Sequence, residues 1–141
     1  DELPETFRES ALLDRFHCFI EGWYLPRIDK SMIYKGWTMN VEYFSEVMHG
    51  LRTQTQYGDV FDQLVEFNSK LSMRDFNAVK RIATAYMKLL FPHWTTVEDV
   101  NIAEFDTYCL QPAIHRRGII NEQLHLIDHE YSSKSPEIWL K

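Results

Sequence analysis

Cysteine and glycine are scarce in this chain of 141 residues, and each scarcity excludes a class of site. Cys18 and Cys109 match no metal or redox spacing, so we expect reduced thiols and a cytoplasmic protein. None of the five glycines is followed by lysine, so these residues contain no GxxxxGK[ST] phosphate-binding loop. An apolar run of eighteen residues and a signal-peptide pattern are also absent, so we expect neither a membrane span nor secretion.

Basic residues are fewer than acidic ones, with 15 Lys or Arg against 21 Asp or Glu. The formal net charge is -6, which gives no overall electrostatic footprint for nucleic acid. The 45% of hydrophobic residues suffices for the core of one domain. The chain begins at Asp1 and stops within the apolar run 138–141, so we expect a fragment of a longer protein.

From residue 40 onward, apolar residues recur with a helical period, which predicts a mainly α fold. We expect helices to begin after Asn40, at Asp59 and after Ser72, and a last helical region over 100–127 with a break at Pro112. Ser72 and Asp75 have the spacing of a capping box, and that helix should end at Phe91, before Pro92. The polar residues 130–137 are typical of a linker.

One segment differs from the helical pattern. Residues 16–25 are aromatic and apolar and end before Pro26, which predicts a strand. In a larger protein this strand would be buried in a parallel sheet. Cut from its neighbours, it should fold onto the chain's own helices or mediate self-association, giving a monomer or a dimer. The side chains concerned are Phe16, Phe19, Ile20 and Trp23.

Two arginines stand at the starts of predicted elements. Arg74 falls in the first turn of a helix, where a cation opposes the helix dipole, but a guanidinium beside free N–H groups also makes an anion site. The alternative is a surface ion pair with Asp75 or Glu66. Arg15 follows Asp14 at the entry to the predicted strand, where it is either half of a solvated pair or a finger into a neighbouring subunit's site.

Two of the histidines have a spacing that metal ligands can have. His125 and His129 lie four residues apart on one helical face but lack a third ligand, so we favour a surface pair over zinc and expect no metal. Residues 115–117, His-Arg-Arg, are either a solvated basic face or a contact to nucleic acid or another subunit.

The segments around both arginines resemble known ATPases. Residues 12–16, LLDRF, resemble the LLDR and LLSRF segments of Lon proteases and MCM helicases, and residues 72–79, SMRDFNAV, are similar to the MCM pattern SVRQLEAI. The run 15–27 together with 104–124 resembles most closely the BrxL family, the Lon-related proteins of BREX phage-defence systems. That similarity covers most of the chain.

The resemblance implies roles for both residues. Arg15 would be an arginine finger acting in trans, and Arg74 a sensor-2 residue that contacts the phosphates of ATP bound by its own chain. The parent would be an AAA+ ATPase with a Lon-like domain, forming a homo-oligomeric ring and binding ATP and Mg, with DNA contacts in other regions. The fragment would be inactive alone and bind no cofactor, because both Walker motifs are missing from it.

The resemblance also implies domain boundaries. Residues 1–28 would end the large ATPase subdomain, 29–129 would form a helical lid bundle, and 130–141 would lead towards a Lon-like domain. The alternative function is a non-enzymatic helical interaction module that uses the aromatic segment around Trp23 and Tyr24.

Overall fold

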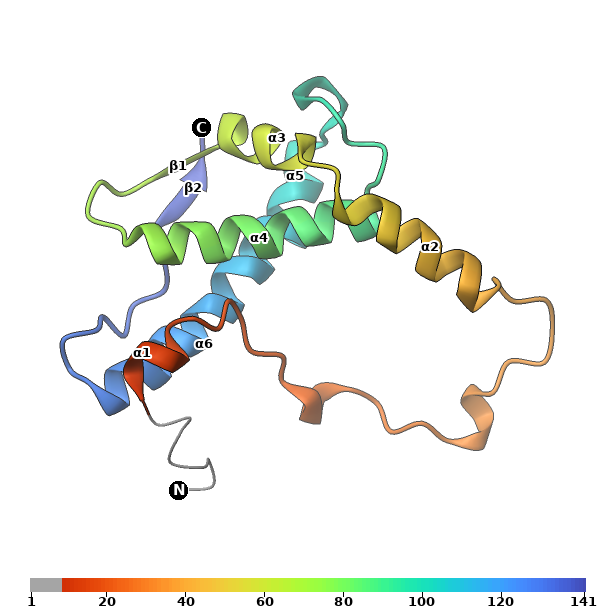
Figure 1. The fold of residues 1–141 in the computed structure, drawn as a ribbon, viewed down its shortest axis with the longest axis horizontal. Helices are drawn as coiled ribbons and strands as arrows, with labels where there is room; N and C mark the ends of the chain where they lie inside the picture. Colours follow the sequence, from red (N-terminus) through yellow and green to blue (C-terminus); the bar gives the residue numbers. More distant parts are fainter. Residues whose placement is uncertain (1–8) are drawn as a thin grey trace. The chain divides into compact units, whose positions relative to one another are not determined.

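The computed structural model describes residues 9–141, and its architecture is mainly α, which confirms the predicted fold class. The first eight residues of the expected 1–28 segment lie outside this described part. Three elements are short 3-10 turns (η2, η3 and η4), and η5 is a π-helical turn. In chain order the elements are α1 Ser10–Leu13, η2 Gly22–Tyr24, η3 Lys30–Met32, α2 Val41–Arg52, α3 Gln56–Leu64, β1 Val65–Phe67, α4 Met73–Leu90, η4 Val97–Asp99, α5 Ile102–Phe105, η5 Asp106–Leu110, α6 Gln111–Ile127 and β2 Ile138–Leu140 (Figure 1).

The described chain divides into two units. We call residues 9–19 together with 55–141 the body, and residues 20–54 the arm. This division does not coincide with the boundaries at 28 and 129 that the resemblance implies, and those boundaries stay a prediction.

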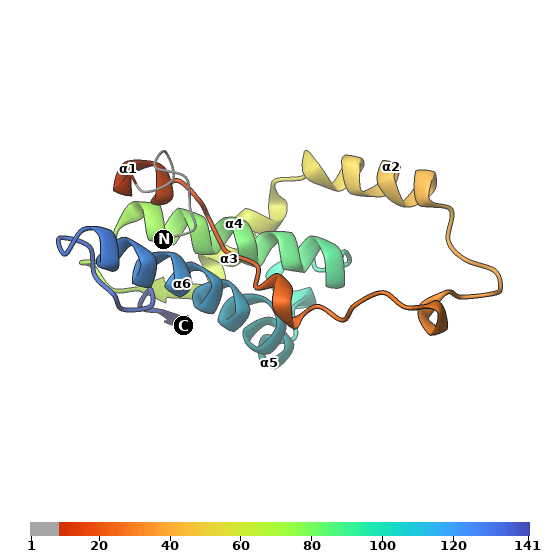
Figure 2. The same ribbon diagram turned by 90° about the horizontal axis from the view of Figure 1, so that it is seen from below.

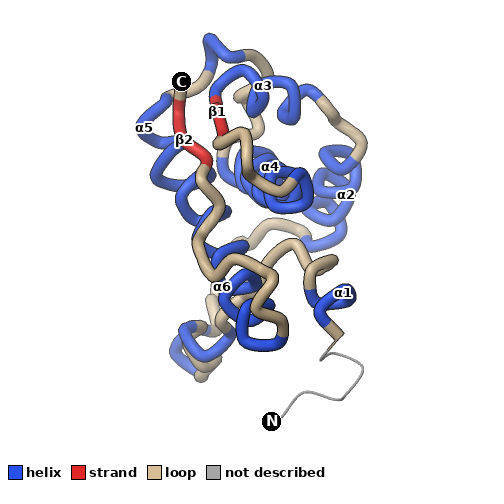
Figure 3. The backbone as a smooth tube through the Cα atoms, turned by 90° about the vertical axis from the view of Figure 1, so that its left-hand side faces the viewer, coloured by secondary structure: helices blue, strands red, loops and turns tan. Residues whose placement is uncertain are grey.

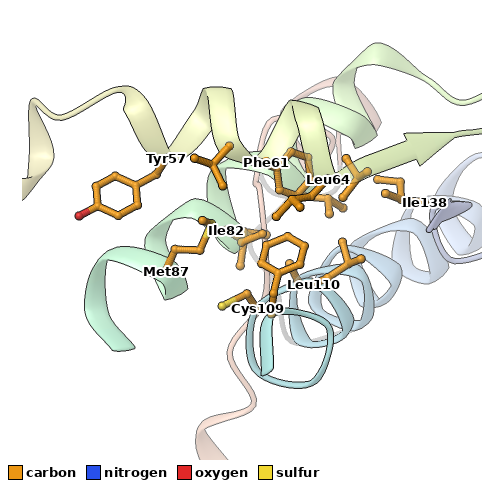
Figure 4. Packing of buried hydrophobic residues seen from close by; sticks show 14 of the residues in the cluster. Tyr57, Phe61, Leu64, Ile82, Met87, Cys109, Leu110 and Ile138 are labelled. Carbon is orange, nitrogen blue, oxygen red and sulfur yellow. The ribbon is translucent and has the colours of Figure 1, made fainter. Parts of the chain in front are cut away.

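The core of the body lies between α3, α4 and the helical stretch from α5 to α6. Figure 4 shows Tyr57, Phe61 and Leu64 of α3 in the same buried cluster as Ile82 and Met87 of α4. Phe61 also meets Phe105 edge to face, with 6.2 Å between the ring centroids. At one end of the core, Trp94 is buried and stacks on Phe91 at 3.8 Å. Removal of these large side chains from water is the main source of stability for the body.

The helix α4 begins and ends where the sequence predicts. The Oγ of Ser72, the N-cap, accepts a hydrogen bond from the N–H of Arg74 at 3.2 Å. At the other end, the N–H of Phe91, the C-cap, donates to the carbonyl of Met87. The second half of the expected capping box is missing, because the Asp75 carboxylate binds a residue of α6 instead. Figure 2 shows α4 and α6 side by side, and the two helices are in contact along the body.

Helix α3 begins earlier than predicted. It begins at Gln56, three residues before Asp59, because its first turn closes with a hydrogen bond from the Gly58 N–H to the Thr55 carbonyl at 2.9 Å. Tyr57 therefore lies inside the helix, where it is fully buried and donates its hydroxyl to the Pro92 carbonyl at 2.7 Å.

The chain near Pro112 stays helical, and a π-helical turn precedes the proline where the sequence predicts a break. The helical stretch 102–127 changes from α5 through the π-helical turn η5 to α6, and Pro112 lies in the first turn of α6. Proline has no N–H to continue the helical ladder, and π turns accommodate such interruptions. Further along α6, a Cβ on Gly118 would lie 2.7 Å from the Ser135 Oγ, so a larger residue at this position would require the Ser135 hydroxyl to move.

The segment predicted as a linker returns to the body. After residues 130–137, β2 pairs antiparallel with β1, with Val65 opposite Leu140 and Phe67 opposite Ile138 (Figure 3). The Asn68 N–H donates to the Glu137 carbonyl at 3.1 Å and extends the pairing. The apolar residues at the end of the sequence are therefore part of the fold.

The predicted strand over residues 16–25 is wrong. These residues have no ladder partner among the described residues, and only the 3-10 turn η2 interrupts their irregular path. A strand needs a neighbour for its backbone groups. The Phe16 carbonyl instead accepts a hydrogen bond from Arg117, and Cys18 packs on the core of the body.

The arm contains α2 and two 3-10 turns but no buried residue. As predicted, α2 follows Asn40, whose Oδ1 accepts a hydrogen bond from the Glu42 N–H at 2.8 Å. Its apolar stripe stays uncovered, and the Phe44 side chain is 46% exposed.

Candidate functional site

Arg74 lies in the first turn of α4, and its partner is not one that the sequence suggested. Its Nη1 donates to Oδ2 of Asp14, sixty residues earlier in the chain, rather than to Asp75 or Glu66. This hydrogen bond, followed by the charge of Asp14, raises the pKa of the Arg74 guanidinium. The side chain remains 54% exposed, so one face of the guanidinium is open to a solution anion.

Asp14 is buried, which corrects the expectation of a solvated Asp14–Arg15 pair. It follows the short helix α1, whose Leu13 packs against Ile120 and Leu124 of α6. The two carboxylate oxygens of Asp14 take different partners, Arg74 at Oδ2 and Arg117 at Oδ1, the latter at 2.6 Å.

The structure corrects the prediction for Arg117. The run 115–117 predicts a solvated basic face or a contact surface, but the Arg117 side chain is 1% exposed. The Nε donates to Asp75 Oδ1 at 2.7 Å, and Nη1 donates to the backbone carbonyls of Asp14 at 3.2 Å and Phe16 at 2.6 Å. Two carboxylates and two carbonyls together satisfy a guanidinium that would otherwise be costly to bury.

A signal for this burial was present in the sequence. Arg117 falls on the same face of α6 as Ala113, Ile120 and Leu124, all of which are buried. An arginine on the apolar stripe of a helix either reaches solvent or finds buried acceptors. The acceptors come from residues 14–16 and 75, so the sequence alone could not identify them.

Arg15 is exposed, and its side chain makes no hydrogen bond or ion pair with the described residues. Its backbone is held firmly, because the Arg15 N–H donates to the Leu12 carbonyl at 3.1 Å and the Phe16 N–H donates to the Leu13 carbonyl at 3.0 Å. The structure thus brings the Arg15 segment and the start of α4 together through Asp14.

Arg74 faces an open groove of about 680 Å³ on the body. Arg81 and Asn77, further along the same face of α4, also line it. Among the other residues that line the groove are Asp14, His17, Ser72 and Tyr131. Two guanidiniums, an amide and an imidazole against one carboxylate make this surface suited to an anion such as a phosphate.

His17 is exposed and lies beside Arg81, with 3.0 Å between its Nε2 and Arg81 Nη1. Partial desolvation, and then the positive charges of Arg81 and Arg117, lower the pKa of His17. The guanidinium donates to Nε2 only when this nitrogen carries no proton, so the neutral imidazole fits the geometry.

The other candidate residues stay apart from this groove. His125 and His129 form a ring pair at 5.0 Å, and His125 Nδ1 lies 2.7 Å from the Tyr131 carbonyl oxygen. Arg116 lies over the Tyr86 ring at 5.8 Å. Within residues 9–141 no cluster of three or more histidine, cysteine or acidic side chains is arranged to hold a metal ion.

Both cysteines are free thiols. Cys109 is fully buried in the core, and this desolvation raises the pKa of its thiol to about 12. No helix in the described part of the chain has the length and apolar character needed to cross a bilayer.

Comparison with known proteins identifies the family of this chain. A family model described as Lon-like protease BrxL-like, ATPase domain, matches residues 1–137. The chain belongs to this ATPase-domain family.

Two relatives carry the name Lon-like protease BrxL. The protein from Escherichia coli O9:H4 (strain HS) is 29% identical over 122 residues, which are 86% of this chain and 17% of the relative. The protein from Bacillus cereus (strain H3081.97) is 27% identical over 128 residues, which are 90% of this chain and 18% of the relative. The chain therefore spans less than a fifth of the length of these relatives.

Proposed function

We propose that this chain is the nucleotide-sensing helical lid of an AAA+ ATPase that acts in phage defence. Membership of the BrxL-like ATPase-domain family supports this function, and the observation that carries it is the half-exposed Arg74 at the start of α4. A helix N-terminus with an available guanidinium favours the negative charge of a nucleotide phosphate.

In this proposal Arg74 contacts the γ-phosphate of ATP bound by its own chain. A phosphate in the groove competes with Asp14 for the Arg74 guanidinium, because two anions cannot share it without repulsion. The Asp14 carboxylate keeps its second partner, Arg117, so it is not left unpaired when Arg74 turns to the nucleotide.

Arg15 is proposed as the finger that reaches ATP bound by the neighbouring subunit of a homo-oligomeric ring. Its exposed side chain on a tightly bonded backbone supports this role. An arginine supplied in trans stabilises the charge that develops on the transferred phosphoryl group. ATP and Mg would bind to the parent protein, where a Walker motif pair supplies the phosphate loop and the Mg ligands.

The remaining parts of the proposal concern the parent protein. It would carry a Lon-like domain beyond this chain, reside in the cytoplasm and contact DNA through other regions. The body presented here has no overall basic charge, with a formal net charge of -6 for the chain, so it contributes little non-specific attraction to DNA.

A subunit-mixing experiment tests the two arginine roles in the full-length protein. Arg15→Ala should lower kcat for ATP by 10³-fold or more, roughly the contribution of an arginine finger, and leave nucleotide binding near normal. Mixing Arg15→Ala subunits with Walker-dead subunits that keep Arg15 should restore part of the activity. Failure to complement contradicts the trans role.

Arg74→Ala provides the matched comparison. If Arg74 acts in cis, the same Walker-dead partner does not rescue its defect. Because Asp14 joins the segments of Arg15 and Arg74, rescue to the level seen for Arg15→Ala would show that both residues serve the neighbour's nucleotide. That result would overturn the cis assignment and keep the ATPase function.

The arm supports a second candidate, a non-enzymatic interaction module. Trp23 and Tyr24 are 68% and 76% exposed, as a partner-binding aromatic surface requires. If this is the function, Trp23→Ser abolishes association with the partner, and Arg15→Ala leaves every measurable activity of the full-length protein unchanged.

A further inference from the structure

The buried side chain of Arg117 contacts residues 14–16, the segment that carries the exposed Arg15. Its Nη1 donates to the carbonyl of Asp14, the residue before Arg15, and to the carbonyl of Phe16, the residue after it. Its Nη2 holds the Asp14 carboxylate at 2.6 Å. Two of its hydrogen bonds therefore fix backbone carbonyls on both sides of Arg15, and a third fixes the Asp14 side chain, so only the Arg15 side chain is left free.

The same guanidinium is fixed from its other side by α4. Arg117 Nε donates to Asp75 Oδ1 at 2.7 Å, and Asp75 lies in the first turn of the helix that carries Arg74. The path from α4 through Arg117 to residues 14–16 thus consists of charge-assisted hydrogen bonds between largely buried groups. Such bonds are shorter and stronger than neutral ones.

Stability alone is a weak reason for this arrangement. Burial of an ion pair costs several kcal/mol per ion, and well-packed apolar side chains of similar volume often stabilise a core as well or better. A planar guanidinium with five donors in a fixed fork does, however, hold its partners in one geometry. Catalytic side chains need such geometry, since a misplacement of about 1 Å can cost 10²-fold in rate.

We propose that Arg117 is a positioning residue for Arg15: it holds the backbone of residues 14–16 against α4 so that the Arg15 side chain projects in one direction. This inference rests on the proposed finger role of Arg15. It adds a buried residue that acts on the reaction through the position of Arg15, in addition to pairing with the Asp14 carboxylate.

Arg117→Lys in the full-length protein is the primary test. Lysine keeps the charge but cannot reach Asp75, Asp14 and both carbonyls at once, because it presents a single ammonium. We expect kcat for ATP to fall by roughly 10- to 100-fold with KM near the unsubstituted value. Arg116→Lys, one position away on the surface of α6 over Tyr86, is the matched control and should leave both parameters unchanged.

A double variant separates positioning from general support of the fold. With Arg15 already replaced by alanine, its position no longer matters, so Arg15→Ala/Arg117→Lys should be no slower than Arg15→Ala alone. If the two losses multiply instead, Arg117 acts independently of Arg15 and the inference is overturned. If Arg15→Ala itself leaves kcat unchanged, it is the proposed finger role that fails.

A second variant tests the same inference if the full-length Arg117→Lys protein fails to form its oligomer. Asp75→Asn removes the charge that holds Arg117 Nε without touching residues 14–16. The inference requires the same pattern with a smaller loss: lower kcat, unchanged KM and no further loss on top of Arg15→Ala. A multiplying loss in this variant overturns it in the same way.

Discussion

The body and the arm both contain aromatic side chains, but several of these are buried in the body and none is buried in the arm. In the body, aromatic side chains such as Phe61 and Phe105 are fully buried, whereas Trp37 in the arm is 100% exposed. The two units also differ in charge. The arm has four Lys or Arg (27, 30, 35 and 52) and four Asp or Glu (21, 29, 42 and 46), so the formal charge of -6 belongs to the rest of the chain.

This difference shows that apolar composition does not by itself identify a core. A side chain contributes hydrophobic stability only when other groups remove it from water. The helices of the body do this for one another, whereas α2 has an amphipathic stripe with nothing in the arm to cover it. An exposed aromatic surface with no net charge is typical of a region that binds another chain.

The largest expected effect distinguishes a core aromatic side chain from an arm aromatic side chain. Phe61→Ala should lower the free energy of unfolding by about 3–5 kcal/mol, because it leaves a cavity between α3, α4 and Phe105. Trp37→Ala should change it by less than about 0.5 kcal/mol, since Trp37 has no packing to lose. Urea unfolding of the chain measures both, and equal losses would contradict the division into body and arm.

The second prediction concerns self-association. Replacement of residues 20–54 by a flexible Gly-Ser linker of about 20 residues should lower the unfolding free energy by less than ~1 kcal/mol, because the arm buries no residue. The same change should abolish any concentration-dependent association. Light scattering across a concentration series measures association, and urea unfolding measures stability.

Point variants locate the association more closely. Ile20→Ser/Trp23→Ser should make the chain monomeric, and Leu126→Ser is the matched control because Leu126 is a 71% exposed apolar residue of the body. If the unsubstituted chain is monomeric at high concentration, self-association through this segment is wrong.

A smaller effect is expected from pH within the body. The pKa of His17 is lowered in the folded chain, so above its ordinary value near 6.5 the imidazole is neutral in both states and pH has no effect through it. Below that value the unfolded chain takes up the proton first, and stability falls as pH decreases towards the folded pKa. His17→Gln should remove this part of the pH dependence.

Thermal unfolding between pH 7.5 and pH 5 measures the effect of His17. The matched control is His49→Gln in the arm, which keeps His17 intact and should retain the pH dependence of the unsubstituted chain. An unchanged slope in His17→Gln would contradict the assignment.

The smallest expected effect is chemical and leaves the fold intact. With a pKa of about 12, the Cys109 thiol has a thiolate fraction on the order of one in ten thousand at pH 8, and the core also shields it. Iodoacetamide should therefore modify Cys18 in the folded chain and reach Cys109 only after unfolding in guanidinium. Mass spectrometry identifies the modified residue, and rapid labelling of Cys109 in the folded chain would show that the core opens locally.

The sequence predicts the helices best where local signals agree. Asn40 and Ser72 as N-caps and the stop before Pro92 all depend on backbone chemistry within a few residues, and the structure has each of them. The strand expected over residues 16–25 is wrong because aromatic content favours a strand only when a neighbouring strand can take its hydrogen bonds.

The candidate site could be predicted only in part. Arg15 and Arg74 follow from their places in short motifs, and their exposure in the structure leaves both available for the proposed roles, which stay predictions. Asp14 and Arg117 could not be paired from the sequence, since 103 residues separate them.

The sequence by itself determined the helical class of this protein, most helix boundaries and the absence of a phosphate-binding loop in these residues, because each of these follows from local side-chain and backbone chemistry. The tertiary structure alone decided that Asp14 is buried between two guanidiniums and that β2 returns to β1. It also decided which aromatic side chains form a core and which remain in water. These outcomes depend on contacts between distant segments, where burial of charge is tolerated only if partners from elsewhere in the chain arrive in the correct geometry.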